Sequence, residues 1–267
     1  MKNRFNKILV LSSVFAFVAC EKVIDIELQE SDKKIVVEAN MRSFAGESYV
    51  LLSETVSSDD SNSNKKISGG TVFVKDGAGV EYEFVESVEV PGRYLNPSFV
   101  LNENDTYDLT VNAAETVLTA NAKTNAKPVI DSLTYIMQVG GFFGETEDTA
   151  FLVFYNFMDD VDETNYYRIR SWVNGKADEN FYLTDDKLFN GLQIVAPMFG
   201  TQIGPRDTVF VELQSMDEAN FTYLNTLSLN LSQSAFAAAP ANPVTNIENG
   251  IGYFGAYTLD TLTLILP

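Results

Sequence analysis

Hydrophobic and polar side chains alternate along most of the chain beyond its N-terminal segment, with the period of two that is typical of half-buried β-strands. The segment KKIVVEANM is one example, because it places Ile35, Val37, Ala39 and Met41 on one face of an extended chain. Turn-forming sequences such as DGAG separate these segments, and no helical spacing interrupts them. The pattern predicts an antiparallel β-sandwich over residues 33–126.

A proline in the segment NAKPVIDSL marks the expected domain boundary, which we place near Lys127-Pro128. Strand-like alternation continues beyond it, except in DEANFTYLNTLSLNLSQSAF, where apolar residues from Phe221 to Leu231 have helical spacing. This segment also begins with two acidic residues, which suit a helix N-terminus. The sequence therefore predicts a second β-rich domain over residues 127–267, with one α-helix near 217–236.

Residues 1–19 have the organisation of an export signal. Lys2, Arg4 and Lys7 precede the apolar stretch ILVLSSVFAFVA. That stretch is shorter than the run of about 20 apolar residues that a membrane-spanning helix needs. We expect residues 1–19 to be removed during export.

Cys20, the one cysteine of the chain, follows this stretch in the sequence FVAC. FVAC resembles the lipobox of bacterial lipoproteins, in which the cysteine thiol is acylated and becomes the new N-terminus, although Phe17 stands where leucine is usual. A lone cysteine has no partner for a disulfide, which favours lipidation over a chance cysteine after an ordinary cleavage site. Acyl chains, each stabilised by about 0.8 kcal/mol per buried methylene, would hold Cys20 in a membrane, with residues 20–32 as a tether.

The composition excludes several classes of function. The formal net charge is −19, which disfavours binding to nucleic acid, because phosphate contacts need clustered lysine and arginine. The chain contains no histidine. With Cys20 expected to be acylated, histidine-based triads, cysteine nucleophiles and metal sites built from histidine or cysteine are not expected, and we predict neither a metal nor a cofactor.

The acidic residues do not mark a defined catalytic or metal site. The cluster DDVDETN, beginning at Asp159, does not match an EF-hand loop, and we expect it to be a solvated turn between strands. Two carboxylates would suffice for a glycoside hydrolase, but among 37 acidic residues no pair stands out. We therefore predict that the protein is not an enzyme, and a carboxylate-pair hydrolase is the third hypothesis for its function.

Aromatic residues provide the candidates for binding. Phe142 and Phe143 lie in the glycine-rich segment VGGFFGE, where they would form a partner-binding tip or, alternatively, fold under the loop into the core. Trp172 and the pair Tyr166-Tyr167 would either stack on a sugar or follow the ordinary alternation of a strand.

Four tripeptides share the form Asp-(Ser/Thr)-apolar, which resembles the O-glycosylation acceptor motif of exported Bacteroidota proteins. The alternative is that such a tripeptide is simply a turn entering a strand. The candidate acceptor residues are Ser132, Thr149, Thr208 and Thr261.

Three blocks in a fixed order, CEKVIDIEL, KKIVVEANM and NPVTNIENGIGYFGAY (Asn242–Tyr257), resemble the Bacteroidota lipoproteins grouped as the domain of unknown function 4249 (DUF4249) family. The resemblance covers essentially the whole chain after the signal. The segment GRYLNPSFVLNENDTYDLTV also resembles prealbumin-like sandwiches. The expected fold class is therefore mainly β: a prealbumin or immunoglobulin-like antiparallel sandwich, then a second β-rich domain with one α-helix. The Asn242–Tyr257 block is expected to be structural, with a partner surface as the alternative.

The resemblance implies an outer-membrane lipoprotein of the kind often found alongside TonB-dependent transporters, and it carries over no catalytic residue. We predict a lipid-anchored, non-enzymatic accessory or binding module, associated with a β-barrel transporter in nutrient uptake. The alternative is a structural or assembly lipoprotein of the cell envelope without a small ligand. Whether the protein faces the periplasm or the cell surface is left open by the sequence.

Overall fold

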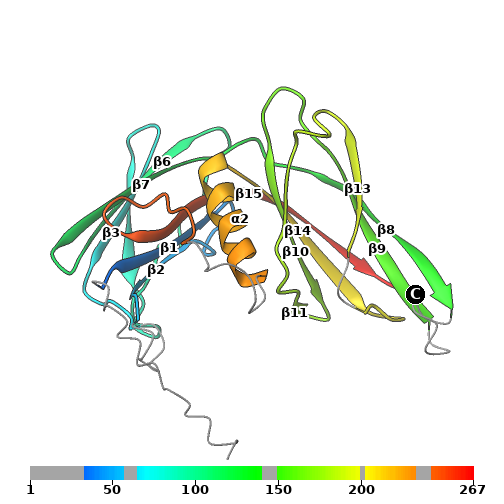
Figure 1. The fold of residues 1–267 in the computed structure, drawn as a ribbon, viewed down its shortest axis with the longest axis horizontal. Coiled ribbons are helices and arrows are strands. Elements are labelled where there is room, and N and C mark those ends of the chain that lie inside the picture. Colours follow the sequence, from blue (N-terminus) through cyan, green and yellow to red (C-terminus); the bar gives the residue numbers. More distant parts are fainter. Residues whose placement is uncertain (1–32, 57–64, 140–148, 199–201, 233–241) are drawn as a thin grey trace, which may run out of the picture. The chain divides into compact units, whose positions relative to one another are not determined.

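The computed structural model describes residues 33–56, 65–139, 149–198, 202–232 and 242–267. The chain divides into two units, Met1–Asp32 and Lys33–Pro267, and the described residues all belong to the second. They are mainly β with one helix, labelled α2, which confirms the expected fold class (Figure 1).

The secondary structure follows the alternation of the sequence closely. The first seven strands are β1 (Ile35–Arg42), β2 (Tyr49–Glu54), β3 (Thr71–Asp76), β4 (Glu81–Glu86), β5 (Arg93–Leu95), β6 (Thr106–Ala113) and β7 (Thr116–Lys123). The later elements are β8 (Ile130–Val139), β9 (Thr149–Met158), β10 (Tyr166–Val173), β11 (Lys176–Ala177), β12 (Tyr182–Asp185), β13 (Gln193–Pro197), β14 (Thr208–Met216), α2 (Glu218–Ser232) and β15 (Ile251–Ile265).

These strands form two hydrogen-bonded sheets. The long sheet has twelve strands in the order β11-β10-β14-β15-β1-β2-β5-β4-β3-β6-β7, with β12 pairing with β10. The three-stranded sheet has the order β13-β9-β8. Strands distant in sequence are thus neighbours in the long sheet, above all β15 and β1.

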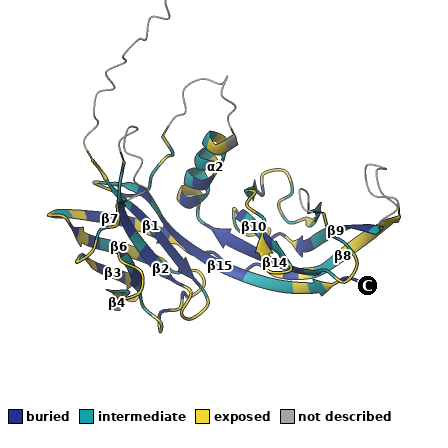
Figure 2. Ribbon diagram, turned by 90° about the horizontal axis from the view of Figure 1, so that it is seen from below, coloured by how far each residue is buried: buried dark blue, intermediate teal, exposed yellow. Residues whose placement is uncertain are grey.

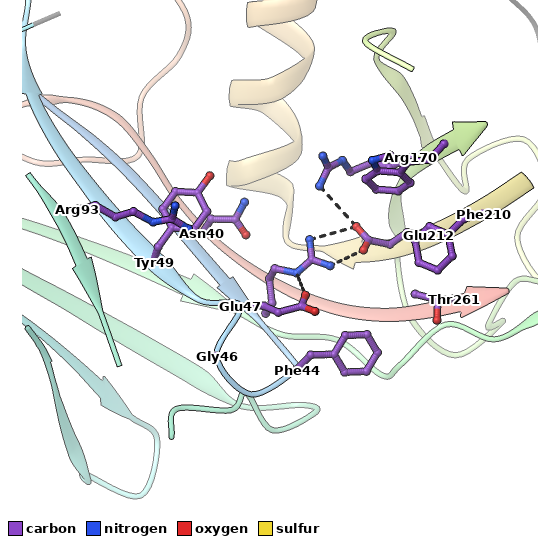
Figure 3. Close-up of a pocket in the computed structure, with 12 residues that line it drawn as sticks. Asn40, Phe44, Gly46, Glu47, Tyr49, Arg93, Arg170, Phe210, Glu212 and Thr261 are labelled. Atoms are coloured by element: carbon purple, nitrogen blue, oxygen red, sulfur yellow. Dashed lines mark hydrogen bonds and ion pairs between the residues drawn. The ribbon is translucent and has the colours of Figure 1, made fainter. Parts of the chain in front are cut away.

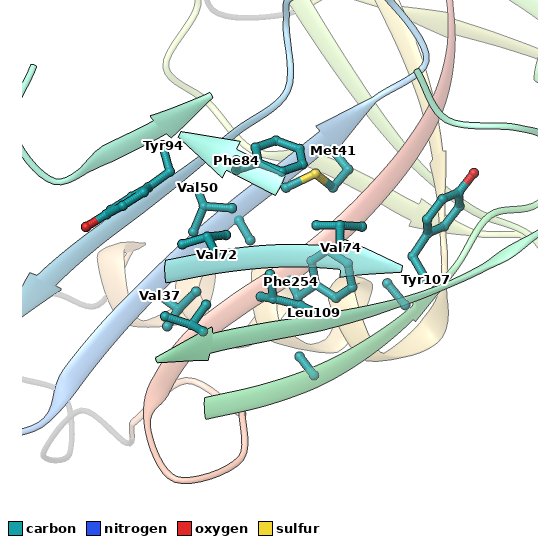
Figure 4. Packing of buried hydrophobic residues seen from close by; sticks show 14 of the residues in the cluster. Val37, Met41, Val50, Val72, Val74, Phe84, Tyr94, Tyr107, Leu109 and Phe254 are labelled. Carbon is teal, nitrogen blue, oxygen red and sulfur yellow. The ribbon is translucent and has the colours of Figure 1, made fainter. Parts of the chain in front are cut away.

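Strands β1–β7 form the N-terminal sandwich, because this part of the long sheet folds back over itself. Inward side chains of β1, β3 and β6, among them Val37, Val72 and Leu109, meet in one core (Figure 4). The far end of the sandwich closes toward β15, where the backbone N–H of Glu248 donates to the carbonyl of Thr119 at 2.8 Å. The antiparallel sandwich that the sequence predicted is therefore present, and C-terminal residues complete it.

The strand β15 belongs to both parts of the long sheet. From Ile251 to Tyr257 it runs parallel to β1, and from Thr258 to Ile265 it runs antiparallel to β14. It is buried through much of its length and more exposed toward its end (Figure 2). The domain boundary expected near residue 127 stays a prediction, but a division there would separate β15 from the sandwich with which it pairs.

A second core lies between the three-stranded sheet and the β10-β14-β15 part of the long sheet. Phe151 and Val153 of β9 meet Ile169 of β10 and Val211 and Leu213 of β14 there. Because side chains alternate along a strand, the remaining side chains of β10 and β14 face away from this core. That opposite face carries the helix α2.

The helix α2 packs through its N-terminal part. Asp217 caps it by accepting the backbone N–H of Asn220 at 2.9 Å. The ring of Phe221 lies 5.0 Å from that of Tyr166 in β10 and Leu224 is buried, whereas Leu231 is 68% exposed. The apolar spacing that predicted a helix near 217–236 therefore overstates the length of the buried stripe.

Gly252 lies where β15 passes close to the backbone of β1. Its φ is +112°, and a Cβ atom at this position would overlap the carbonyl oxygen of Val37. We expect Gly252→Ala to weaken the β1–β15 pairing and to lower the free energy of unfolding, measured in urea, by clearly more than the ~1–2 kcal/mol that left-handed strain costs alone.

Gly79→Ala is the matched control for this variant. Gly79 also has a positive φ, +84°, but no atom lies within 4 Å of its added Cβ, so only the strain should remain. Equal losses of stability in the two variants would contradict a packing requirement at Gly252.

Candidate functional site

Alternation along β14 sends its side chains to two different faces. Val211 and Leu213 enter the second core, so Phe210 and Glu212 point to the opposite face, where Met216 packs against α2. A pocket of about 610 Å³ opens on this face and is lined by residues of β1, β2, β5, β10, β14 and β15 and of the loop after β1.

A buried ion pair crosses the middle of the pocket. Arg42, the last residue of β1, donates from Nη1 to Oε1 of Glu212 at 3.2 Å, and its Nη2 binds Oε2 of the same carboxylate. Arg42 and Glu212 are 9% and 2% exposed. In the sheet register Arg42 lies opposite Tyr257 and Glu212 opposite Thr261, so the two side chains meet over β15 from its two sides.

Further polar contacts surround this pair. The side-chain amide of Gln214 donates to Oε1 of Glu212 at 2.7 Å, and Nη1 of Arg170 lies 3.8 Å from the same oxygen. Nε of Arg42 lies 2.8 Å from Oε2 of Glu47. Removing two charges from water is unfavourable unless they are paired, and here each charge has a partner, although Nε of Arg42 and Oε1 of Gln214 are buried without a hydrogen bond among the described residues.

Two arginines of the pocket stack on aromatic rings. The guanidinium carbon of Arg93 lies 4.6 Å from the ring centroid of Tyr49, and that of Arg170 lies 4.8 Å from the ring centroid of Trp172. The Trp172 ring in turn lies 5.3 Å from that of Phe210. Figure 3 shows Arg93 and Tyr49 at one end of the pocket and Arg170 and Phe210 at the other.

Two polar groups at the Arg93 end are buried without a hydrogen-bond partner among the described residues, namely Oδ1 of Asn40 and Nε of Arg93. Asn40 itself is 8% exposed. At the other end, burial and the nearby Arg168 lower the pKa of Arg170 from its ordinary value. Buried polar atoms of this kind are uncommon in folded proteins, and the two at the Arg93 end border a pocket that a ligand could enter.

The charge of the pocket differs in sign from that of the whole chain. Its wall carries three arginines and two glutamates, whereas the chain has a formal net charge of −19. Four aromatic side chains complete the wall. A locally positive, aromatic-lined pocket suits an anion with a flat apolar face, against the net negative charge of the chain.

Cys20, Phe142 and Phe143 lie outside the described residues, so lipid attachment and the partner-binding tip stay predictions. The four candidate glycosylation residues lie on four different strands and do not form one surface. They are Ser132 in β8, Thr149 in β9, Thr208 in β14 and Thr261 in β15. Of these four, Thr261 lines the pocket, where a glycan would occupy the space of a ligand.

Two aspartates of these tripeptides have structural contacts of their own. Asp207 accepts the backbone N–H of Gly204 and the side-chain amide of Asn174, each at 2.7 Å, and these bonds lower its pKa. Asp260 accepts the backbone N–H of Ile130 at 2.9 Å. Both contacts fit the alternative in which the tripeptide marks a turn or a strand, and glycosylation stays a prediction.

The exposed apolar residues nearest in sequence to Phe142 lie at the end of β8. Ile136, Met137 and Val139 are 56%, 57% and 71% exposed. Successive residues of a strand point to opposite faces, so this end of β8 packs against a core on neither face. Because β8 is also the edge of its sheet, the β8 end, defined as these three residues, is a second candidate surface.

The expectation of a solvated turn is wrong for Asp159. It is 3% exposed and accepts hydrogen bonds from the hydroxyl of Tyr167 and the backbone N–H of Gly191, both at 2.8 Å. Burial and this carboxylate raise the pKa of Tyr167. Among the described residues no group of three or more acidic, histidine or cysteine side chains is placed to hold a metal ion.

The pocket could not be predicted from the sequence. The sequence contains one local signal. Arg170 and Trp172 are two positions apart in a predicted strand, so their side chains lie on the same face, in an otherwise acidic chain. The partners Arg42 and Glu212 carried no such signal, since 170 positions separate them.

A family model described as "Domain of unknown function (DUF4249)" matches residues 21–263. A comparison with curated proteins found no match. Among solved structures, a two-domain fibronectin type III segment of chicken tenascin is 10% identical, with 88% of this chain and 99% of that chain covered and a TM-score of 0.24. Domains FN1–FN3 of chicken CNTN1 are 10% identical, with 86% and 66% covered and a TM-score of 0.24. At this TM-score, neither structure supports a conclusion about this chain.

The helices of the described residues include none that is both long and apolar enough to cross a membrane.

The Arg42–Glu212 pair can be tested by removing its partners singly and together. Arg42→Met or Glu212→Gln leaves one buried charge without its partner, and we expect each to lower the free energy of unfolding in urea by about 3–5 kcal/mol. The double variant Arg42→Met/Glu212→Leu should recover much of this loss, because it leaves neither charge behind.

The control is Lys75→Met. Lys75 forms an ion pair with Asp108 at 3.3 Å, but the two side chains are 49% and 53% exposed. Its loss should cost below about 1 kcal/mol. Single variants of Arg42 and Glu212 that are as stable as Lys75→Met would show that the buried pair does not hold β1 and β14 together.

Proposed function

The chain belongs to the DUF4249 family, and from that premise we propose that it is an outer-membrane lipoprotein, acting as a non-enzymatic accessory and binding module of a TonB-dependent β-barrel transporter. In this proposal lipidated Cys20 anchors the protein. Residues 20–32 form the tether, and Lys33–Pro267 carries the binding surfaces.

The observation that carries the proposal is the exposed β8 end. Ile136, Met137 and Val139 are all more than half exposed, and apolar side chains exposed on both faces of one edge strand favour an interaction site there. No charged side chain interrupts the segment YIMQV that contains them, although the chain as a whole is strongly acidic. An edge strand without such charges is suited to pairing with another protein.

The carboxylates of the pocket favour binding over catalysis. Glu47 and Glu212 both contact the guanidinium of Arg42. A glycoside hydrolase needs two carboxyl groups that can act on the substrate, whereas both of these are held by the same guanidinium. A carboxylate-pair hydrolase therefore finds little support in this pocket.

The alternative of a structural envelope lipoprotein without a small ligand is favoured by one feature. The ion pair at the centre of the pocket has its partners within the chain, so this part of the pocket has a structural role without any ligand. The two functions differ in whether a barrel protein co-purifies and whether the pocket binds a ligand.

Lipid attachment is tested by Cys20→Ala. Without the thiol there is nothing to acylate, so we expect the variant to accumulate as an uncleaved or soluble precursor, detected by membrane fractionation and by the mass of the chain. Ser13→Ala, a similar change within the apolar stretch, should fractionate like the wild type. Normal membrane association of Cys20→Ala would overturn the lipoprotein part of the proposal.

The partner surface is tested by Ile136→Lys. A charge at the β8 end should reduce the amount of β-barrel transporter, identified by mass spectrometry, that co-purifies after mild detergent extraction. The melting temperature should stay the same, because Ile136 is 56% exposed. Val88→Lys is the control, since Val88 is fully exposed on the N-terminal sandwich. Equal recovery with the two variants, or no barrel with the wild type in repeated extractions, would contradict the proposal.

A further inference from the structure

The unpaired positive charge of the pocket lies at Arg93. Arg42 is neutralised by Glu212, whereas Arg170 lies 3.8 Å from that carboxylate, beyond hydrogen-bonding distance. Arg93 stacks on Tyr49 and forms no ion pair with another described residue, and its Nε is buried without a hydrogen bond. A guanidinium in this state binds a carboxylate well, because its N–H groups match the two carboxylate oxygens.

Asn40 adds a requirement for a hydrogen-bond donor. It lies opposite Tyr49 in the sheet register, so its unpaired Oδ1 is close to the Arg93 end of the pocket (Figure 3). An amide oxygen accepts hydrogen bonds, so the ligand must supply an N–H or O–H group there. A simple aliphatic or aromatic carboxylate has no such donor, whereas a hydroxylated one does.

The two ends of the pocket repeat the same combination of groups. Arg93 on Tyr49 at one end corresponds to Arg170 on Trp172 at the other, and the Arg42–Glu212 pair lies between them. A repeated combination of cation and flat ring fits a ligand that repeats a carboxylate and a flat apolar face along its length. A volume of about 610 Å³ is within the range of small-molecule sites.

We propose that this pocket binds a short acidic oligosaccharide whose successive rings carry carboxylates, that is, an oligouronate. One carboxylate binds Arg93, and a hydroxyl of the same ring donates to Oδ1 of Asn40. The next ring packs its C–H face against Trp172 and directs its carboxylate to Arg170. The inference goes beyond the proposed function, because it concerns a ligand and holds whether or not a transporter partner is found.

An acidic peptide shares the carboxylates but fits the pocket less well. Further acceptors on the wall include the carboxylate of Glu47, which is about half exposed, and the hydroxyl of Thr261. The many hydroxyls of a sugar can donate to several acceptors at once, and its rigid ring presents a flat face to the aromatic wall. A peptide has one backbone donor per residue and flexible acidic side chains, which lose more conformational entropy on binding.

The fluorescence of Trp172 reports directly on the pocket, because it is the one tryptophan of the chain. The full-length protein, purified in detergent, is titrated with digalacturonate, dimannuronate and diguluronate. We expect a saturable change with at least one of the three and a Kd below about 1 mM. The methyl ester of the bound compound keeps its skeleton but lacks its charge, and it should produce no saturable change.

Substitutions locate the binding within the pocket. Arg93→Met should raise the Kd at least about tenfold, since it removes a charge-assisted contact, and Arg93→Lys should recover part of the affinity. Arg170→Met should also weaken binding, which protects the test if one variant folds poorly. Lys75→Met is the matched control, because Lys75 pairs with Asp108 on the sandwich and does not line the pocket, so the Kd of this variant should be unchanged.

Three results would overturn the inference. The first is the absence of a Trp172 response to all three diuronates up to about 10 mM. The second is binding of the methyl ester with the affinity of the acid. The third is saturable binding of triglutamate in place of the diuronates, which would assign the pocket to acidic peptides.

Discussion

The described unit depends on one strand pairing with two partners. Tyr257 is the last residue of β15 opposite β1, and Thr258 is the first opposite β14. The Arg42–Glu212 ion pair crosses the strand next to this change of partner. Hydrogen bonds of β15 join the two parts through the backbone, and the ion pair joins them through side chains. Neither part of the long sheet is complete without β15, so the place where β15 changes partner is needed for the fold whether or not it binds a ligand.

The same junction explains why polar groups gather in a protein with two ordinary apolar cores. The strands that line each apolar core send the side chains of one face into it. On the opposite face of β10 and β14, the helix α2 covers only some of the side chains. The pocket lies among the side chains of this opposite face that the helix leaves uncovered. Partial burial there keeps the charges away from bulk water, so that they interact strongly, while a ligand can still reach the pocket. Pairing satisfies Glu212 within the chain, while Arg93 and Asn40 keep groups that a ligand can meet. The pocket thus combines a structural centre with two ends suited to binding.

Local pattern and long-range pairing differ in what the sequence reveals. Alternation predicted β1 and β10, and the acidic start of the helix led to Asp217, which caps it. The exposure of Leu231 could not be foreseen, because helical spacing says nothing about how far a sheet extends beneath a helix. The parallel pairing of β1 with β15 joins the two ends of the unit, and the pocket exists only through that pairing. The sequence contains the residues that line the pocket, but it does not show that they lie close together.

The order of folding follows from the same topology. Closing a loop between β1 and β15 involves most of the chain, and such non-local contacts form late because their entropic cost precedes their stabilisation. The hairpins of β6 with β7 and of β8 with β9 are local and can form earlier. Because Arg42 reaches Glu212 only over β15, the pocket is completed only when the C-terminal strand has been added. Binding at this site therefore requires the fully assembled unit, and a chain that lacks residues 251–265 lacks the site as well as the strand.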